Sequence, residues 1–326
     1  MKKILSLLVI LLVLQIGLIV LTNSSRQQLG AYVANEPLLN FQPAEIDTID
    51  ITGPDGQAVV LKKAGGTWRI ADGFDAPADA SAVDDLLHTL AGLKKGLPVA
   101  TTKDAAVRFK VAADAFERDI VLKKGTEKKA ELLVGTSPMF RKVHVRLPGS
   151  DDIISVTFAA NDAGVQPTDW LDRAMLTFDA GKITDLTIGP LHLQRKGKTL
   201  VPDDLAPGET VKAEAVTRLV NSLAGMRVEA VLGNSDKPEY GLDKPELTCS
   251  FALASGKKQT WRFGKPEKEQ YHVLKSSNSD LFFKVADSQV QPLLNADRNA
   301  LIQTAATTGS TDNPQLKQRK KPDTGN

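Results

Sequence analysis

Two segments of this chain, residues 81–93 and 214–226, carry the same pattern of apolar side chains. In each, apolar residues recur at i, i+3, i+4 and i+7, the spacing of a helix that buries one stripe against a core. The repeated apolar residues are Val83, Leu86, Leu87, Leu90 and Leu93 in the first segment, and Val216, Leu219, Val220, Leu223 and Met226 in the second. An internal repeat constrains the whole architecture, because each copy must build the same supersecondary unit.

Short strand patterns surround each helix in the same order. In the first half, apolar alternation at 46–51 and 58–61 brackets the turn residues 53–56, and further strands are predicted at 119–122, 130–134, 143–147 and 153–156. In the second half, the corresponding strands are predicted at 183–188, 191–193, 261–264 and 272–273, with one more opening at 280. The sequence therefore predicts an α+β fold of two tandem repeats, 45–178 and 179–303, each a mostly antiparallel sheet with an amphipathic helix.

Each repeat ends alike, with a proline followed by an Asp-Arg pair. Pro167 precedes Asp172-Arg173, and Pro292 precedes Asp297-Arg298. Since proline is favoured at the first position of a helix, we expect a short helix to open at each proline. The Asp-Arg pairs are expected to fix that terminal helix through ion pairs or caps.

The N-terminus predicts attachment to a membrane. Lys2 and Lys3 precede an apolar run of eighteen residues, 4–21, which as a helix is about 27 Å long, just enough to cross a bilayer core. A cleaved signal peptide is the competing interpretation, but its apolar region is usually shorter and ends in small residues. We therefore predict a transmembrane signal anchor within 1–25 and a tether at 26–44. Because positively charged residues beside a membrane span stay in the cytoplasm, Lys2 and Lys3 place the rest of the chain outside the cytoplasm.

Composition excludes several classes of function. The formal net charge of +2 leaves no electrostatic footprint for nucleic acid over the folded part. Cys249 is the single cysteine, so neither an intrachain disulfide nor a thiolate metal site can form. Residues 304–326 lack apolar side chains to bury and are predicted to be a disordered basic tail.

The familiar catalytic motifs are missing. No G-x-S-x-G and no G-x-G-x-x-G occurs. Gly197-Lys198-Thr199 has the end of a phosphate-binding loop, but the first glycine that the loop requires is replaced by His192. We therefore expect no enzyme activity, no catalytic residue, no metal and no cofactor.

Four residues are the candidates for facing a ligand or partner: His144, Trp170, Tyr240 and His272. The two histidines occupy equivalent strand positions, so they are either a pair of pH-sensitive or ligand-facing groups or a residue inherited by both halves and accommodated by packing. Trp170 could be an aromatic platform for a sugar, although core packing is the better interpretation.

These features together resemble a bacterial family of membrane-anchored envelope proteins, "domain of unknown function 4340". The resemblance covers about residues 40–302 and is carried by the N-terminal run, the duplicated units, Trp170-Leu171-Asp172-Arg173, and the segment 240–245, Tyr-Gly-Leu-Asp-Lys-Pro. The first half departs from this pattern, with Phe109-Lys110-Val111 where the second has Tyr240-Gly241-Leu242. The family's motifs are structural, and no catalytic residue is carried over.

Genes of this family often lie beside those for permeases and auxiliary subunits of gliding-motility-type ABC transporters. The resemblance therefore implies a single-pass protein of the bacterial inner membrane, with its C-terminal bulk in the periplasm. Its implied partners are a transporter permease and an auxiliary subunit. The leading hypothesis is an accessory or scaffold subunit that uses sheet edges or faces as partner surfaces. The alternative is a periplasmic binding module for a glycan or small ligand in a cleft between the repeats.

Overall fold

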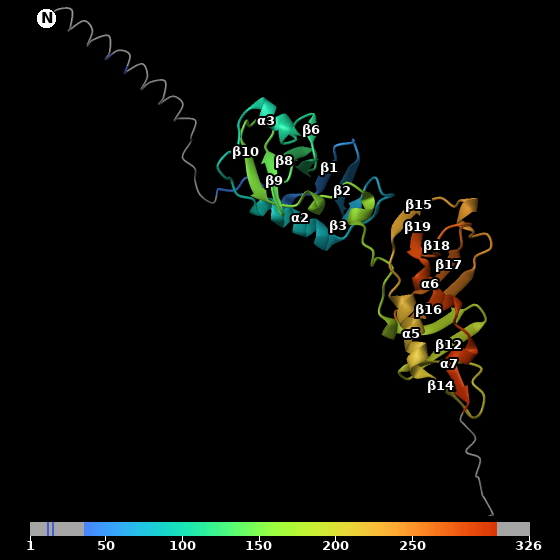
Figure 1. The fold of residues 1–326 in the computed structure, drawn as a ribbon. Helices are drawn as coiled ribbons and strands as arrows, with labels where there is room; N and C mark the ends of the chain where they lie inside the picture. Colours follow the sequence, from blue (N-terminus) through green and yellow to red (C-terminus); the bar gives the residue numbers. More distant parts are fainter. Residues whose placement is uncertain (1–11, 13–14, 16–35, 305–326) are drawn as a thin grey trace, which may run out of the picture. The chain divides into compact units, whose positions relative to one another are not determined.

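The computed structural model describes residues 36–304, together with Leu12 and Gln15 (Figure 1). The predicted signal anchor, the first part of the tether and the tail beyond Thr304 lie outside the described residues, apart from Leu12 and Gln15. In the described part of the chain, no helix combines the length and the apolar character that crossing a membrane requires.

The chain divides into two compact units. The first comprises Met1–Met175 with Glu229–Gly233, and the second comprises Leu176–Val228 with Asn234–Asn326. Two eight-stranded sheets account for most of the strands, and every strand pair with a given register is antiparallel. The predicted α+β class with mostly antiparallel sheets is confirmed.

The first sheet has the strand order β10-β9-β8-β7-β1-β2-β3-β4. Its strands are β1 (Thr48–Thr52), β2 (Ala58–Ala64), β3 (Thr67–Ile70), β4 (Ala76–Pro77), β7 (Arg118–Lys124), β8 (Glu127–Val134), β9 (Lys142–Arg146) and β10 (Ile153–Thr157). The other elements of this part are η1 (Pro43–Glu45), α2 (Ala80–Gly92), α3 (Lys103–Arg108), the two-residue strands β5 (Val111–Ala112) and β6 (Ala115–Phe116), η2 (Ala160–Asp162) and α4 (Pro167–Trp170).

The second sheet has the strand order β13-β12-β11-β16-β17-β18-β19-β15. Its strands are β11 (Ile183–Ile188), β12 (Leu191–Lys196), β13 (Thr199–Pro202), β15 (Ala230–Gly233), β16 (Leu247–Leu253), β17 (Lys258–Gly264), β18 (Tyr271–Ser276) and β19 (Phe282–Ala286). The remaining elements are η3 (Ala180–Lys182), β14 (Glu209–Val211), α5 (Ala213–Ala224), η4 (Pro238–Tyr240), α6 (Asp287–Leu294), α7 (Arg298–Leu301) and β20 (Ile302–Thr304), of which β14 and β20 pair with each other.

Seven strands follow the same order in both sheets. Read from one end, β3-β2-β1-β7-β8-β9-β10 corresponds to β13-β12-β11-β16-β17-β18-β19. In each case three strands come first, then the amphipathic helix, then the other four. The two sheets differ at their additional strands, β4 and β15.

Each amphipathic helix buries the stripe that its sequence predicts. Helix α2 lies beside β3 and helix α5 beside β13 (Figure 1). Every apolar residue of the two predicted stripes is buried. Alternation places the strand residues on the same core, as in β1, where Ile49 and Ile51 are buried and Asp50 between them is partly exposed.

Helix α2 begins where the sequence favours it. The Asp79 carboxylate accepts hydrogen bonds from the backbone N–H groups of Ser81 and Ala82, at 3.0 and 3.3 Å. This N-cap satisfies donors that have no partner inside the helix.

The prediction of a proline at each helix opening is right in one case and wrong in the other. Pro167 stands at the first position of α4, but Pro292 lies inside α6. Helix α6 begins earlier because β19 leads directly into Asp287, whose carboxylate lies in the positive first turn of the helix.

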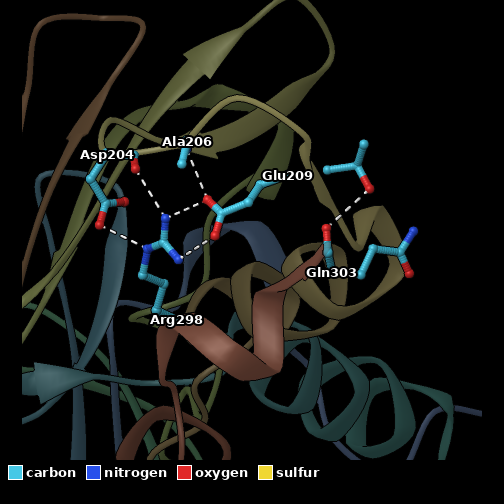
Figure 2. A network of polar contacts seen from close by, with 6 residues as sticks. Asp204, Ala206, Glu209, Arg298 and Gln303 are labelled. Atoms are coloured by element: carbon cyan, nitrogen blue, oxygen red, sulfur yellow. Dashed lines mark hydrogen bonds and ion pairs between the residues drawn. The ribbon is translucent and has the colours of Figure 1, made fainter. Parts of the chain in front are cut away.

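The second Asp-Arg pair holds the C-terminal segment as expected. Asp297 caps α7 by accepting from the Ala300 N–H at 2.7 Å. Arg298 forms ion pairs with Asp204, at 2.8 Å, and with Glu209, at 2.5 Å (Figure 2). The Arg298 hydrogen bond lowers the pKa of Glu209 to about 2. In the first unit, Arg173 instead lies 3.5 Å from a backbone oxygen, that of Thr168.

Candidate functional site

The four candidate residues divide between the two units. His144 and Trp170 belong to the first unit, and Tyr240 and His272 belong to the second. All four are buried. The contacts of each side chain decide whether it can face a ligand or is fixed by packing.

His144 on β9 is held by its neighbours in the first unit. Its Nδ1 donates to the Thr136 carbonyl oxygen at 3.0 Å, and its ring stacks on Phe109 with the centroids 4.2 Å apart. A buried imidazole with a hydrogen bond and a stacking partner is accounted for by packing. The interpretation as a residue accommodated by packing fits His144 better than a ligand-facing role.

Tyr240 takes part in a close backbone approach that both units share. A Cβ placed on Gly264 would lie 2.0 Å from the backbone carbonyl oxygen of Tyr240. A Cβ placed on Gly135 would lie 2.0 Å from the backbone carbonyl oxygen of Phe109. Only glycine fits such an approach. The next residues, Lys110 and Gly241, are both left-handed, with φ of 54° and 67°. The first half therefore departs from the pattern in residue type while keeping its geometry.

His272 on β18 lies between two carboxylates of the second unit. Its Nε2 is 2.9 Å from Glu246 Oε2, and its Nδ1 is 2.7 Å from Asp287 Oδ1, an ion-pair distance with poor hydrogen-bond alignment. Lys265 donates to both oxygens of Asp287, at 2.8 and 2.6 Å. Burial disfavours the charged form of Asp287, but the Lys265 hydrogen bond and the charges of His272 and Lys265 outweigh it and lower the pKa.

This cluster of Glu246, Lys265, His272 and Asp287 is built to hold elements together. A catalytic base needs a nucleophile or a water at one of its ring nitrogens. Both nitrogens of His272 face carboxylate oxygens, and the side chain is only 1% exposed. The cluster joins β18 to the start of α6 and to the segment before β16. Its chemistry is that of a structural ion-pair network.

Trp170 forms part of the wall of a cavity in the first unit. The cavity has a volume of about 350 Å³ and lies between one face of α2 and the segment from η2 to α4. Its lining combines polar and apolar residues: Ala82, Asp85, Leu86, Thr89, Asn161, Asp162, Gly164, Asp169 and Trp170. The Trp170 indole N–H donates to the Gly164 oxygen at 2.9 Å. The indole is therefore fixed in the wall and buried, rather than presented as an open platform.

The first unit also has exposed apolar side chains that were not predicted from the sequence. Met139 and Phe140, in the loop between β8 and β9, are 61% and 91% exposed. Leu97, Val99 and Val107 are also more than half exposed. The signal was present in Pro138-Met139-Phe140, an apolar pair in the connection between the predicted strands 130–134 and 143–147, where polar residues are usual.

Comparison with known proteins identifies the family. A family model described as "Domain of unknown function (DUF4340)" matches residues 68–245, which is more than half of the chain. The chain belongs to the DUF4340 family. Searches of curated proteins and of solved structures each gave no match.

The DUF4340 match runs from Trp68 on β3 to Pro245, just before β16, so it extends over parts of both units. It contains three of the four candidate residues, His144, Trp170 and Tyr240, and ends before His272. The exposed loop at 139–140 also lies inside it. Within the described part of this DUF4340 protein, no group of three or more His, Cys, Asp or Glu side chains is placed to hold a metal ion.

Proposed function

We propose that this protein is a membrane-anchored accessory or scaffold subunit of an ABC-type transport complex. In this proposal the chain is attached to the bacterial inner membrane by residues 1–25, and both units lie in the periplasm. The two units derive from duplication of one ancestral unit, a view supported by their common order of seven strands. The partners are a permease and its auxiliary subunit, as membership of the family suggests.

The observation that carries the proposal is the uneven distribution of exposed apolar side chains. Between residues 36 and 304, every large hydrophobic residue that is exposed belongs to the first unit: Phe74, Leu97, Val99, Val107, Met139 and Phe140. Among the described residues of the second unit, no large apolar side chain is exposed to that degree, and those near its surface, such as Leu205 and Val211, are only partly exposed. Two pairs in this set, Leu97 with Val99 and Met139 with Phe140, are close neighbours in the chain, and neighbouring exposed apolar side chains of this kind favour an interaction surface.

The edge of the first sheet supplies a surface of the kind that binds proteins. Strand β10 is the last strand of this sheet. The Val99 N–H donates to the Ile153 oxygen at 2.8 Å, and the Ile153 N–H donates to the Ala100 oxygen at 2.9 Å. This bridge pairs the start of β10, and Gly96 lies beside Ser155 further along the strand. The segment 96–100, which contains Leu97 and Val99, therefore follows this edge of the sheet. Polar backbone groups flanked by apolar side chains favour pairing with another chain.

Chemical crosslinking in intact membranes tests the proposal. The full-length protein is crosslinked and purified by affinity, and its partners are identified by mass spectrometry. We expect a permease and an auxiliary subunit in near-equal amounts, and a several-fold loss of both in the double variant Leu97→Ser, Val99→Ser. The matched variant Thr217→Ser, on the exposed face of α5, keeps both. Recovery of the protein alone would contradict the proposal.

A periplasmic binding module for a glycan or small ligand is the second candidate function. The cavity beside Trp170 favours it, because its aspartate, asparagine and threonine side chains offer hydrogen bonds to a polar ligand. The predicted position of that ligand, between the two repeats, stays a prediction. Stabilisation of the protein against heat by a ligand, lost in Asp85→Ala, would support this function over the scaffold.

A further inference from the structure

The loop between β8 and β9 holds two apolar side chains at its tip in a fixed conformation. The Lys142 N–H donates to the Met139 oxygen at 3.1 Å, which closes a turn with Phe140 and Arg141 at its centre. Ser137 Oγ lies 2.8 Å from the Met139 oxygen and 2.7 Å from the Lys142 oxygen, so its single proton braces the turn from inside.

This turn combines a strained backbone conformation with a phenylalanine side chain that is not packed against the protein. Arg141 has φ of 55°, a left-handed conformation that side chains with a Cβ adopt at a cost. Phe140, beside it, is 91% exposed to water. A strained turn that displays a phenylalanine without burying it points to a binding role for the tip.

Two cations directly follow the apolar tip. From Gly135 to Lys142 the loop contains Arg141 and Lys142 and no acidic residue. The end of α3 adds to this surface, because the Thr136 N–H donates to the Phe109 oxygen at 2.8 Å. The Arg108 guanidinium lies over the Phe109 ring, 4.8 Å from its centroid.

We propose that this loop docks on an anionic lipid surface. Met139 and Phe140 enter the boundary between headgroups and acyl chains, while Arg141 and Lys142 contact lipid phosphates. The backbone N–H of Lys142 and the backbone oxygens of Met139 and Lys142 form hydrogen bonds within the turn. The groups presented at the tip are therefore apolar side chains and the charged ends of Arg141 and Lys142. A bilayer accepts such a tip without a shaped pocket, whereas a protein partner must supply one.

The length of the chain before the first unit brings this loop within reach of a bilayer. Fourteen residues, 22–35, separate the apolar run at 4–21 from Glu36, and they span at most about 50 Å when extended. The inference rests on the membrane attachment in the proposed function and is independent of the transporter partners. Failure to recover a permease therefore leaves it standing.

Fluorescence of the full-length protein in vesicles tests the inference. Met139→Cys is labelled with the environment-sensitive dye NBD, and Phe140 is retained. Burial raises the pKa of the Cys249 thiol to about 12, so this native cysteine stays unlabelled. The vesicles contain phosphatidylethanolamine and phosphatidylglycerol, with or without lipids that carry a spin-label quencher on the acyl chain.

We expect a blue-shifted emission that the acyl-chain quencher reduces at least two-fold. Adding Phe140→Ser abolishes the quenching, and adding Phe74→Ser, at the other exposed phenylalanine of the first unit, leaves it unchanged. Vesicles without phosphatidylglycerol give several-fold less quenching. Unquenched emission at the wavelength seen in water would overturn the inference. A blue shift that the lipid quencher does not reduce would also overturn it, because the tip would then lie in a protein pocket.

Discussion

His192 on β12 lies between two carboxylates of the second unit. Its Nδ1 lies 2.7 Å from Asp203 Oδ2, and its Nε2 lies 3.0 Å from Asp185 Oδ2. Hydrogen bonds to Asp203 and then to Asp185 raise the pKa of His192 above its ordinary value of 6.5. The folded state therefore binds this proton more tightly than the unfolded state does.

The sign of the pH effect follows from the raised pKa. Stabilisation by the charged His192 is fully present below pH 6.5 and is lost as the pH rises through the higher pKa of the folded state. Because the site is partly exposed, we expect less than about 1 kcal/mol. Urea unfolding from pH 5.5 to 8.5 should show this loss in the wild type and in His88→Gln. It should vanish in His192→Gln, and an unchanged slope in that variant would contradict the assignment.

The amphipathic helices are the elements whose packing the sequence predicts best. The stripes of α2 and α5 combine the helical period with residues that fill a core, so their burial follows from spacing alone. Strands with alternating residues, such as β1 and β11, are predicted for the same reason. Short elements such as β4, β14 and β20 carry too few residues for a period, and pairing with a neighbour decides them.

Truncation of the α5 stripe measures how much that packing contributes. Leu223 is completely buried, so Leu223→Ala leaves a cavity and should lower the free energy of unfolding by about 2–5 kcal/mol. Arg218→Ala, on the exposed face of the same helix, should change it by less than about 0.5 kcal/mol. Urea titrations of the two variants, followed by circular dichroism, give both values. Equal effects would show that α5 is not packed through this stripe.

Sequence reasoning predicts site residues less well than elements. It selects His144 and His272 because they are equivalent, and the structure gives them different partners, Thr136 and Phe109 for one and two carboxylates for the other. Phe109 and Glu246 are distant in the chain, and even Thr136, eight residues from His144, meets it only through strand pairing, so no local pattern reveals these partners. At the tip of the loop between β8 and β9, the apolar pair Met139-Phe140 can be read from the sequence, but its exposure to water is known only from the structure.

At the scale of the whole molecule, the two units share an order of strands but differ in surface. The buried residues of β1 and β11, and of α2 and α5, correspond between the units, as a duplicated fold requires. The exposed large hydrophobic residues of the described chain belong to the first unit alone. We infer that the first unit carries the partner surface, while the second repeats its architecture without large apolar side chains that are exposed to the same degree.

The most direct test is a photo-crosslinking amino acid at position 97 of the full-length protein in intact membranes. If the protein is a scaffold subunit, Leu97, in the exposed segment along the edge of the first sheet, crosslinks to a permease or its auxiliary subunit. The same amino acid at position 218, on the exposed face of α5, should give no such product. Crosslinks from position 97 to copies of this chain alone, or equal products from both positions, would contradict the account.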